Sequence, residues 1–470
     1  MAGFGHADGR SSMQRDNNKK WRLTLLDKVN VGLESFGDHV MHLVFAPDSF
    51  LDIQRFRRAL RLSLDAEPIL GCRLEEGLLG PRWRRWSTPE LDGFELCRLV
   101  MTDDPDAGVR AFMLNNIDCR VEPMVQACVF RSDRDVVCLN VSCVPIDGRG
   151  LLIYLERVFD IYGRLLADAD HVPVSSGFRL RSADALVKCF RWWDAFGLLF
   201  FGLRNQWVDR QTAHNWQFPV AAAATLDRAF HHYQFSESTL DQVDTWRSRQ
   251  GFTFNDVLLA AFYHALQCII RPPSGTVCCV LNTYDLRRYE GQAAPARVAN
   301  YSSFINCNVK LETGMPFREL VMRVAEAMAA RKRHYPGITE GPFIWPLLRL
   351  LPFSVARRVL TALLRHRGES IPVLTNVGVV DIERLMLDGR PLRWLLPYAP
   401  LEYPPKLTVT LATVGRKITL SLGYSRLHFK TEQIRFLFEE MERVIRRNCR
   451  LDIVDGRDVA AAAALQEVEE

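Results

Sequence analysis

The sequence has no long hydrophobic run. Its most apolar stretch, AFGLLFFGL at 195–203, would rise only about 14 Å as a helix, whereas a bilayer core needs roughly twenty residues. The stretch therefore does not predict a membrane span. Two interpretations remain: a buried helix, or a helix that dips into a surface.

Dense positive charge is also missing. The net charge is only +5, and no extended block of Lys or Arg is present that would follow a phosphate backbone. A nucleic-acid partner is therefore not expected. The apolar fraction of 48% and charged fraction of 24% predict a globular chain, and the length of 470 residues predicts two domains.

Paired cysteines and a secretory signal are absent too. The twelve cysteines include no C-x-x-C pair, and the N-terminal segment lacks an apolar signal core. These two absences predict a cytoplasmic protein with free thiols. No metal site is expected.

What is present is an alternation of strand and helix patterns, in two halves of similar content. Mixed sheets with helices in two halves predict α+β domains that face one another across a cleft. The expected division is a flexible N-terminus at 1–20, an N-terminal lobe at 21–210, a C-terminal lobe at 211–452 and a flexible tail at 453–470. The patterns predict strands near 39–46, 134–144, 228–235, 275–287, 301–311 and 406–425, and helices near 51–68, 150–162, 252–270, 316–335 and 430–448.

The segment VSCVPIDGRGLLIYLERV, residues 141–158, has the layout of a catalytic turn. An alternating strand runs into Asp147-Gly148, and an amphipathic helix follows. No histidine accompanies this Asp-Gly pair; only Ser142 and Cys143 precede it.

Five segments together resemble the chloramphenicol acetyltransferase-like superfamily, which includes condensation domains, polyketide-associated acyltransferases and wax ester synthases. The resemblance covers roughly residues 25–450. It implies an α/β sandwich of two lobes arranged in a V with a tunnel at their interface, and transfer of an acyl group from a CoA or carrier-protein thioester to a hydroxyl or amine. The segments are EPILGCRL (67–74), IDGRGLLIYLERVFDIY (146–162), GFTFNDVLLAAFYHAL (251–266), LNTYDLR (281–287) and VLTNVGVVD (373–381).

The family signature His-His-x-x-x-Asp-Gly becomes Ser142-Cys143-Val144-Pro145-Ile146-Asp147-Gly148 here. The resemblance implies that the second His position, occupied by Cys143, is where the general base acts. A thiol with a pKa of about 8.5 is a poor base near neutral pH. Cys143 is then a weak base, a nucleophile that accepts the acyl group, or a small packing residue in the space of a lost imidazole.

The resemblance gives other positions structural or binding roles. It implies that Asp147 pairs with Arg287 and holds the turn, against the alternative of two unrelated surface charges. We expect Gly148 to allow a backbone conformation or a close approach. The resemblance also implies that Asn376, beside Thr375, lines the tunnel and can hydrogen-bond the developing oxyanion, against the alternative that TNVG is simply a turn.

Three histidines carry weaker signals. His231 and His232 form the only His-His pair, but neighbouring side chains in a strand point to opposite faces, so no catalytic or metal role is expected. His264 lies on a predicted helix, where a hydrogen-bonded core histidine is expected rather than a tunnel residue.

The segment 341–367 is rich in Leu, Pro and Arg. It predicts either a peripheral contact with anionic lipid or an acidic carrier, or a core-facing amphipathic helix with a solvated basic side.

The sequence therefore favours an acyltransferase with a lipophilic participant. Its co-substrate would be a CoA or phosphopantetheine thioester, with no permanently bound cofactor. The alternative is an inactive module that binds a thioester, a lipid or a carrier protein.

Overall fold

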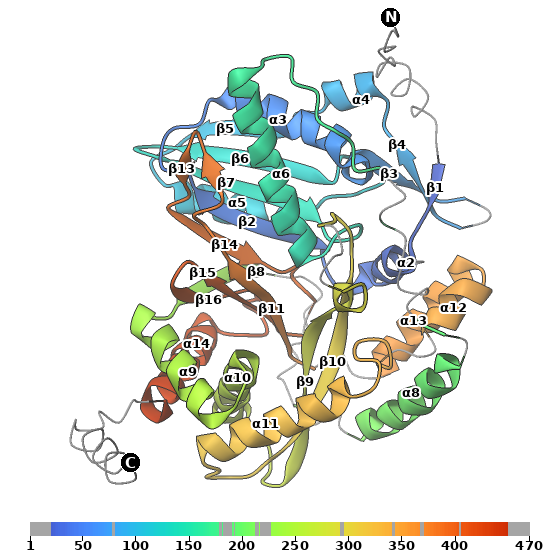
Figure 1. The fold of residues 1–470 in the computed structure, drawn as a ribbon, viewed down its shortest axis with the longest axis vertical. Coiled ribbons are helices and arrows are strands. Elements are labelled where there is room, and N and C mark those ends of the chain that lie inside the picture. The colour runs from blue at the N-terminus through green and yellow to red at the C-terminus, as the bar shows by residue number, and fades with distance from the viewer. Residues whose placement is uncertain are drawn as a thin grey trace, which may run out of the picture.

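A computed structural model describes residues 20–449 except 78–79, 178–180, 182–189, 192, 212–215, 217–226, 292–295, 341–343, 367–370 and 404–405. Apart from Lys20, the expected flexible segments 1–20 and 453–470 lie outside the described residues, as do residues 341–343 and 367 of the Leu-, Pro- and Arg-rich segment 341–367. Two halves are stacked in Figure 1, each built on its own sheet.

The upper half contains a five-stranded sheet in the order β14-β2-β7-β6-β5. Its strands are β2 (Val40–Ala46), β5 (Cys97–Met101), β6 (Val125–Arg131), β7 (Asp135–Ser142) and β14 (Trp394–Tyr398). All seven residues of β2 and all eight of β7 are buried, as expected of central strands covered on both faces. Helices α3 (Ile53–Ala66) and α6 (Gly148–Ala167) lie over the same face and contact one another.

A smaller sheet completes the upper half. It has the order β1-β4-β3, and its strands are β1 (Lys20–Arg22), β3 (Cys72–Glu75) and β4 (Arg82–Arg85). The remaining helices of this half are α2 (Leu25–Gly32), α4 (Thr88–Gly93) and α5 (Pro105–Met113).

The lower half contains a six-stranded sheet in the order β10-β9-β11-β15-β16-β8. Its strands are β8 (Arg228–Gln234), β9 (Thr276–Asp285), β10 (Ser302–Leu311), β11 (Val373–Val380), β15 (Thr408–Val414) and β16 (Lys417–Ser425). The predicted strands of this half are thus confirmed.

Four helices cover this sheet and enclose the second core: α9 (Glu237–Gln250), α10 (Phe254–Ile270), α11 (Phe317–Lys332) and α14 (Thr431–Asn448). Helix α10 is the central one, because ten of its seventeen residues are buried. Such a helix, apolar on nearly all sides, belongs in a core.

The chain crosses back once from the lower half to the upper one. Strand β14 pairs antiparallel with β2, joining Leu395 to Phe45 and Tyr398 to His42. A division near residue 210 therefore leaves one strand of the first sheet in the second part of the sequence. A two-stranded ribbon of β12 (Met386–Leu387) and β13 (Arg390–Pro391) precedes β14.

Three further helices lie at the right of Figure 1: α8 (Asp194–Arg210), α12 (Ile344–Leu350) and α13 (Phe353–His366). Helix α8 contains the apolar stretch 195–203. It is not a buried helix, because Phe196 is 71% exposed and Phe200 65% exposed.

No single helix of the described residues has the length and apolar composition needed to cross a bilayer. One bent pair, Glu237–Gln250 with Phe254–Ile270, meets both criteria only when the two helices are taken together.

Candidate functional site

A cavity of about 450 Å³ lies between the two halves and is lined by both. That volume is within the range of small-molecule sites. Its walls come from α2, β2, β7–α6, β9, β10, α12, α13, β11, β14 and β15, and most of the lining is apolar. Cys143, Asp147 and Gly148 belong to the lining, so the predicted turn faces the interface between the halves.

Asp147 holds this turn in place. Its side chain caps α6, with Oδ1 accepting from the Gly150 amide at 2.7 Å, while Oδ2 accepts from the Tyr301 amide at 2.7 Å. Arg287, just after β9, donates from Nη1 to Oδ2 at 2.8 Å and from Nη2 to Oδ1 at 3.1 Å. The predicted pairing of Asp147 with Arg287 is thus confirmed, and it is a bidentate, nearly buried link between the halves.

The position at which only glycine fits is Gly150, two residues after the predicted Gly148. A Cβ on Gly148 would meet only Val377 Cγ2, at 3.8 Å, which is ordinary contact. A Cβ on Gly150 would lie 2.9 Å from the Ala299 carbonyl oxygen. The expectation for Gly148 is therefore corrected, because the second half approaches α6 closely at Gly150, two residues further along the first turn of the helix.

Cys143 has a histidine partner that the sequence did not indicate. Its Sγ lies 3.5 Å from Nδ1 of His39, and its backbone amide donates to the His39 carbonyl at 2.8 Å. Both residues line the cavity. The His39 ring nitrogen Nε2 has no hydrogen-bond partner among the described residues. An imidazole therefore stands beside the position where the signature has one, and it is supplied by the residue just before β2.

His39 occupies a strained backbone conformation. Its φ of 53° lies in the left-handed region, which residues other than glycine rarely adopt. The preceding Asp38 fixes this turn, since its Oδ1 accepts from the amides of Val40 at 3.3 Å and Leu401 at 3.0 Å. Burial raises the pKa of Asp38 to about 7.

The pairing of β2 with β7 explains how His39 reaches Cys143. Val40 opposes Ser142 in the antiparallel register, so the residue before β2 stands across from the residue after β7. The only local sequence signal for His39 was the short stretch GDHV, residues 37–40, at the start of a buried strand. Its significance depends on the pairing of two strands about one hundred residues apart, which no local pattern reveals.

The thiol of Cys143 is held in its neutral form. Burial raises its pKa well above the ordinary value, and the negative charges of Asp38 and Glu402 raise it further. Ser142 is buried, does not belong to the lining, and accepts from the Val144 amide at 3.4 Å. The thiolate needed for nucleophilic attack is thus disfavoured.

Asn376 does not face the cavity, which corrects its predicted placement. Its side-chain amide donates to Asn255 Oδ1 at 3.3 Å, and its Oδ1 accepts from the Gly378 amide at 2.9 Å. Side chains alternate along β11, so the neighbours Thr375 and Val377 line the cavity instead. Thr375 Oγ1 lies 3.2 Å from Thr283 Oγ1, also in the lining.

His231, His232 and His264 lie outside the cavity lining. His231 stacks on Phe438, whereas His232 contacts the hydroxyl of Tyr398 at 3.1 Å, so the two point to opposite faces as expected. His264 Nε2 lies 3.2 Å from Glu440 Oε1. With Cys268 these two form a group whose ligand atoms lie within 4.8 Å of one another, although Arg443 also pairs with Glu440.

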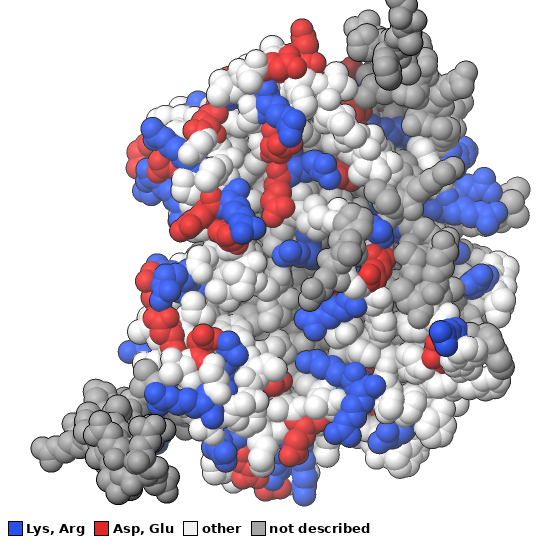
Figure 2. Space-filling view, viewed as in Figure 1, with Lys and Arg blue, Asp and Glu red and all other residues white. Residues whose placement is uncertain are grey.

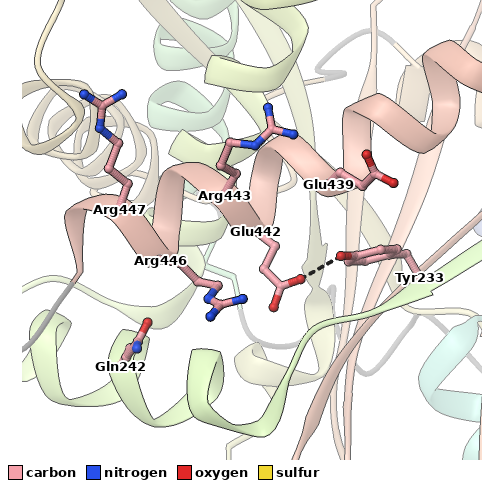
Figure 3. Close-up of a pocket in the computed structure, with 7 residues that line it drawn as sticks. All are labelled: Tyr233, Gln242, Glu439, Glu442, Arg443, Arg446 and Arg447. Atoms are coloured by element: carbon pink, nitrogen blue, oxygen red, sulfur yellow. Dashed lines mark hydrogen bonds between the residues drawn. The ribbon is translucent and has the colours of Figure 1, made fainter.

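A second hollow, of about 710 Å³, lies between α9, β8 and α14 and shares no lining residue with the cavity (Figure 3). Its one buried acid is Glu442, which accepts from Tyr233 at 2.7 Å, the Ser236 amide at 2.9 Å and Thr239 at 2.8 Å. Burial acts to raise the pKa of Glu442, but these hydrogen bonds outweigh it and lower the pKa. The carboxylate of Glu442 is therefore already occupied by hydrogen bonds that join α14 to β8 and to the start of α9.

Comparison with solved structures identifies the fold. The first condensation domain of the calcium-dependent antibiotic synthetase superposes with a TM-score of 0.68 at 17% identity, covering 92% of this chain and 97% of that chain. The chain has the condensation-domain fold.

Two further solved structures share this fold. Trichothecene 15-O-acetyltransferase from Fusarium sporotrichioides gives a TM-score of 0.64 at 14% identity, covering 93% of this chain and 96% of that enzyme. Polyketide synthase associated protein 5 from Mycobacterium tuberculosis gives 0.62 at 11% identity, covering 91% and 98%. No family model and no curated protein matches the sequence.

Proposed function

We propose that the protein is an acyltransferase that moves an acyl group from a CoA or carrier-protein thioester to a hydroxyl or amine, with His39 as its general base. The observation that carries this proposal is the His39 imidazole in the cavity wall, 3.5 Å from Cys143 at the position of the missing signature histidine.

In the proposed reaction, His39 Nδ1–H donates to the neutral Cys143 thiol, which leaves Nε2 unprotonated; Nε2 is buried and has no hydrogen-bond partner among the described residues, so an acceptor bound in the cavity would supply its partner. Nε2 takes the acceptor's proton as its oxygen or nitrogen attacks the thioester carbonyl. Collapse of the tetrahedral intermediate expels the donor's thiolate, which takes the proton from Nε2. The products are an ester or amide and a free thiol.

The surrounding residues have supporting roles. Thr283 and Thr375 offer hydroxyl donors to the developing oxyanion. Asp147 and Arg287 hold the turn that carries Cys143, and so act as positioning residues. The apolar lining favours a lipophilic acyl chain or acceptor.

The test compares two variants in acyl transfer from a panel of acyl-CoA donors to alcohols and amines. We expect His39→Gln to lower kcat by about 10²- to 10⁴-fold, as loss of a general base does. Cys143→Ala should stay within about tenfold of the native rate, because the thiol only orients the ring.

A third variant sharpens this test. In His39→Gln/Cys143→His the imidazole returns to the signature position, and we expect part of the lost rate to return. Equal activity of His39→Gln and the native protein would contradict the proposed base.

Intact-mass measurements after incubation with acyl-CoA distinguish two alternatives: a nucleophilic Cys143 and an inactive binding module. An acyl adduct that disappears in Cys143→Ala would assign the cysteine as nucleophile instead. Tight thioester binding with no turnover of any acceptor by the native protein would indicate an inactive binding module.

A further inference from the structure

Helix α8 is attached to the body of the protein through its polar side. Gly202 and Gln206 are buried there. Asn205 donates to Thr339 Oγ1 at 3.1 Å, and Asp209 accepts from Asn308 at 2.8 Å and pairs with Arg331. These hydrogen bonds occupy the face that a surface helix normally turns to water.

The opposite side of α8 is an exposed apolar stripe. It consists of Phe196, Leu199, Phe200, Leu203 and Trp207, at the three- and four-residue spacing of one helical face. Their side chains are 71%, 48%, 65%, 47% and 65% exposed. This arrangement inverts the usual amphipathic pattern, and an apolar patch of this size indicates an interaction surface.

The charges on α8 are distributed unequally between its two sides. Both acids face the body: Asp194 accepts from the Tyr335 hydroxyl at 2.7 Å, and Asp209 pairs with Arg331. The exposed charged residues of the helix are Arg204 and Arg210. Aromatic and Leu side chains beside exposed arginines are characteristic of helices that lie in the interface of an anionic membrane.

Helix α13 shows a related pattern. Ala356 and Leu360 are buried, whereas Val355, Val359 and Leu363 are 36–43% exposed, and Arg358 is exposed as well. The surface in this part of the molecule is mostly uncharged (Figure 2).

The packed sides of both helices, opposite their exposed apolar residues, face the candidate site. Leu360 of α13 lines the cavity. Asn205 of α8 contacts Thr339, which lies in the chain between two cavity-lining residues, Gly337 and Glu340. A surface bound by these helices would therefore lie close to the cavity wall.

We infer that α8, assisted by α13, docks the protein onto an anionic lipid bilayer. The apolar stripe enters the boundary between headgroups and acyl chains, and the arginines contact lipid phosphates. The docking does not depend on acyl transfer; only the idea that the bilayer delivers a lipophilic substrate rests on the proposed function.

The experiment is vesicle flotation of the full-length protein. The native protein is expected to float with vesicles of phosphatidylcholine and phosphatidylglycerol, and less with phosphatidylcholine alone. Phe200→Gln/Trp207→Gln should weaken binding at least about tenfold, because burial of even one aromatic side chain is worth about that factor.

The matched control is Met101→Gln/Val121→Gln, which removes two apolar side chains, 69% and 65% exposed, from the other half. This variant should float like the native protein. Thermal melting of all variants confirms that each is folded, since only exposed side chains are changed.

Three outcomes would overturn the inference. The native protein fails to float with the anionic vesicles, the α8 variant floats as well as the native protein, or sedimentation shows that the apolar stripe is instead buried against a second copy of the chain. Vesicle binding is read without any acyl substrate, so failure of the proposed reaction leaves this result unaffected.

Discussion

Gly150 and Gly163 lie on the same helix, α6, but have different surroundings. A Cβ at position 150 would approach the Ala299 carbonyl oxygen to 2.9 Å, whereas nothing lies within 4 Å of one at position 163. We expect Gly150→Ala to lower the free energy of unfolding by about 1–3 kcal/mol, because backbone of the second half must move.

Gly163→Ala is the matched control, and it should raise the free energy of unfolding by about 0.5–1 kcal/mol through helix propensity. Urea denaturation followed by circular dichroism measures both. Equal effects of the two substitutions would mean that Ala299 does not constrain the helix.

Individual site residues differ in whether the sequence could predict them. Asp147 and Arg287 were predicted together, because a motif resemblance fixes both in the chain. His39 was missed, because its meaning depends on the register of β2 against β7. Asn376 was misplaced by one strand position, and a one-residue difference along a strand exchanges the two faces of the sheet.

Between elements, the main polar link is the pair of Arg287, after β9, with Asp147, at the start of α6. Arg287→Ala would leave the carboxylate of Asp147 nearly buried with only backbone donors. We expect a loss of about 3 kcal/mol in the free energy of unfolding, together with loss of any acyl transfer, because the turn carrying Cys143 is released.

The comparison variant is Arg426→Ala, which breaks an exposed ion pair with Asp227 and should cost less than about 1 kcal/mol. Differential scanning calorimetry of the two variants measures both losses in the free energy of unfolding. A cost for Arg287→Ala no larger than that for Arg426→Ala would show that the link is not structural.

The elements themselves were predicted well where their apolar period was clear. Strands β2, β7, β8, β9, β10, β15 and β16 and helices α3, α6, α10, α11 and α14 were predicted from alternation and helical spacing, whereas the largely buried strand β6 was not. Helix α8 was left undecided, since its composition does not say which face packs. Its polar face is satisfied by partners far away in the chain, such as Thr339 and Arg331.

For the whole molecule, β14 makes the two parts of the sequence interdependent. Expressed alone, residues 21–210 would leave the long edge of β2 unpaired, although every residue of that strand is buried in the full chain. We expect this fragment to self-associate and to lack a cooperative melting transition.

The control is the same fragment joined through a Gly-Ser linker to residues 392–399, which restores the missing strand. It should be more soluble and melt cooperatively in differential scanning calorimetry. Identical monomeric behaviour of the two fragments would contradict the structural role of β14.

The two-lobed architecture was predictable from the alternation of patterns and from the five segments of resemblance. The return of β14 to the first sheet was not, because its five residues carry no signal of their distant partner.

The two halves are fastened at more than one place, by the strand pairing of β14 with β2 and by the ion pair at the start of α6. A clamshell motion would have to break both fastenings at once. We therefore expect the lobes to stay closed, so that under the proposed function the shape of the cavity of about 450 Å³ between them, rather than a parting of the lobes, decides which molecules are admitted.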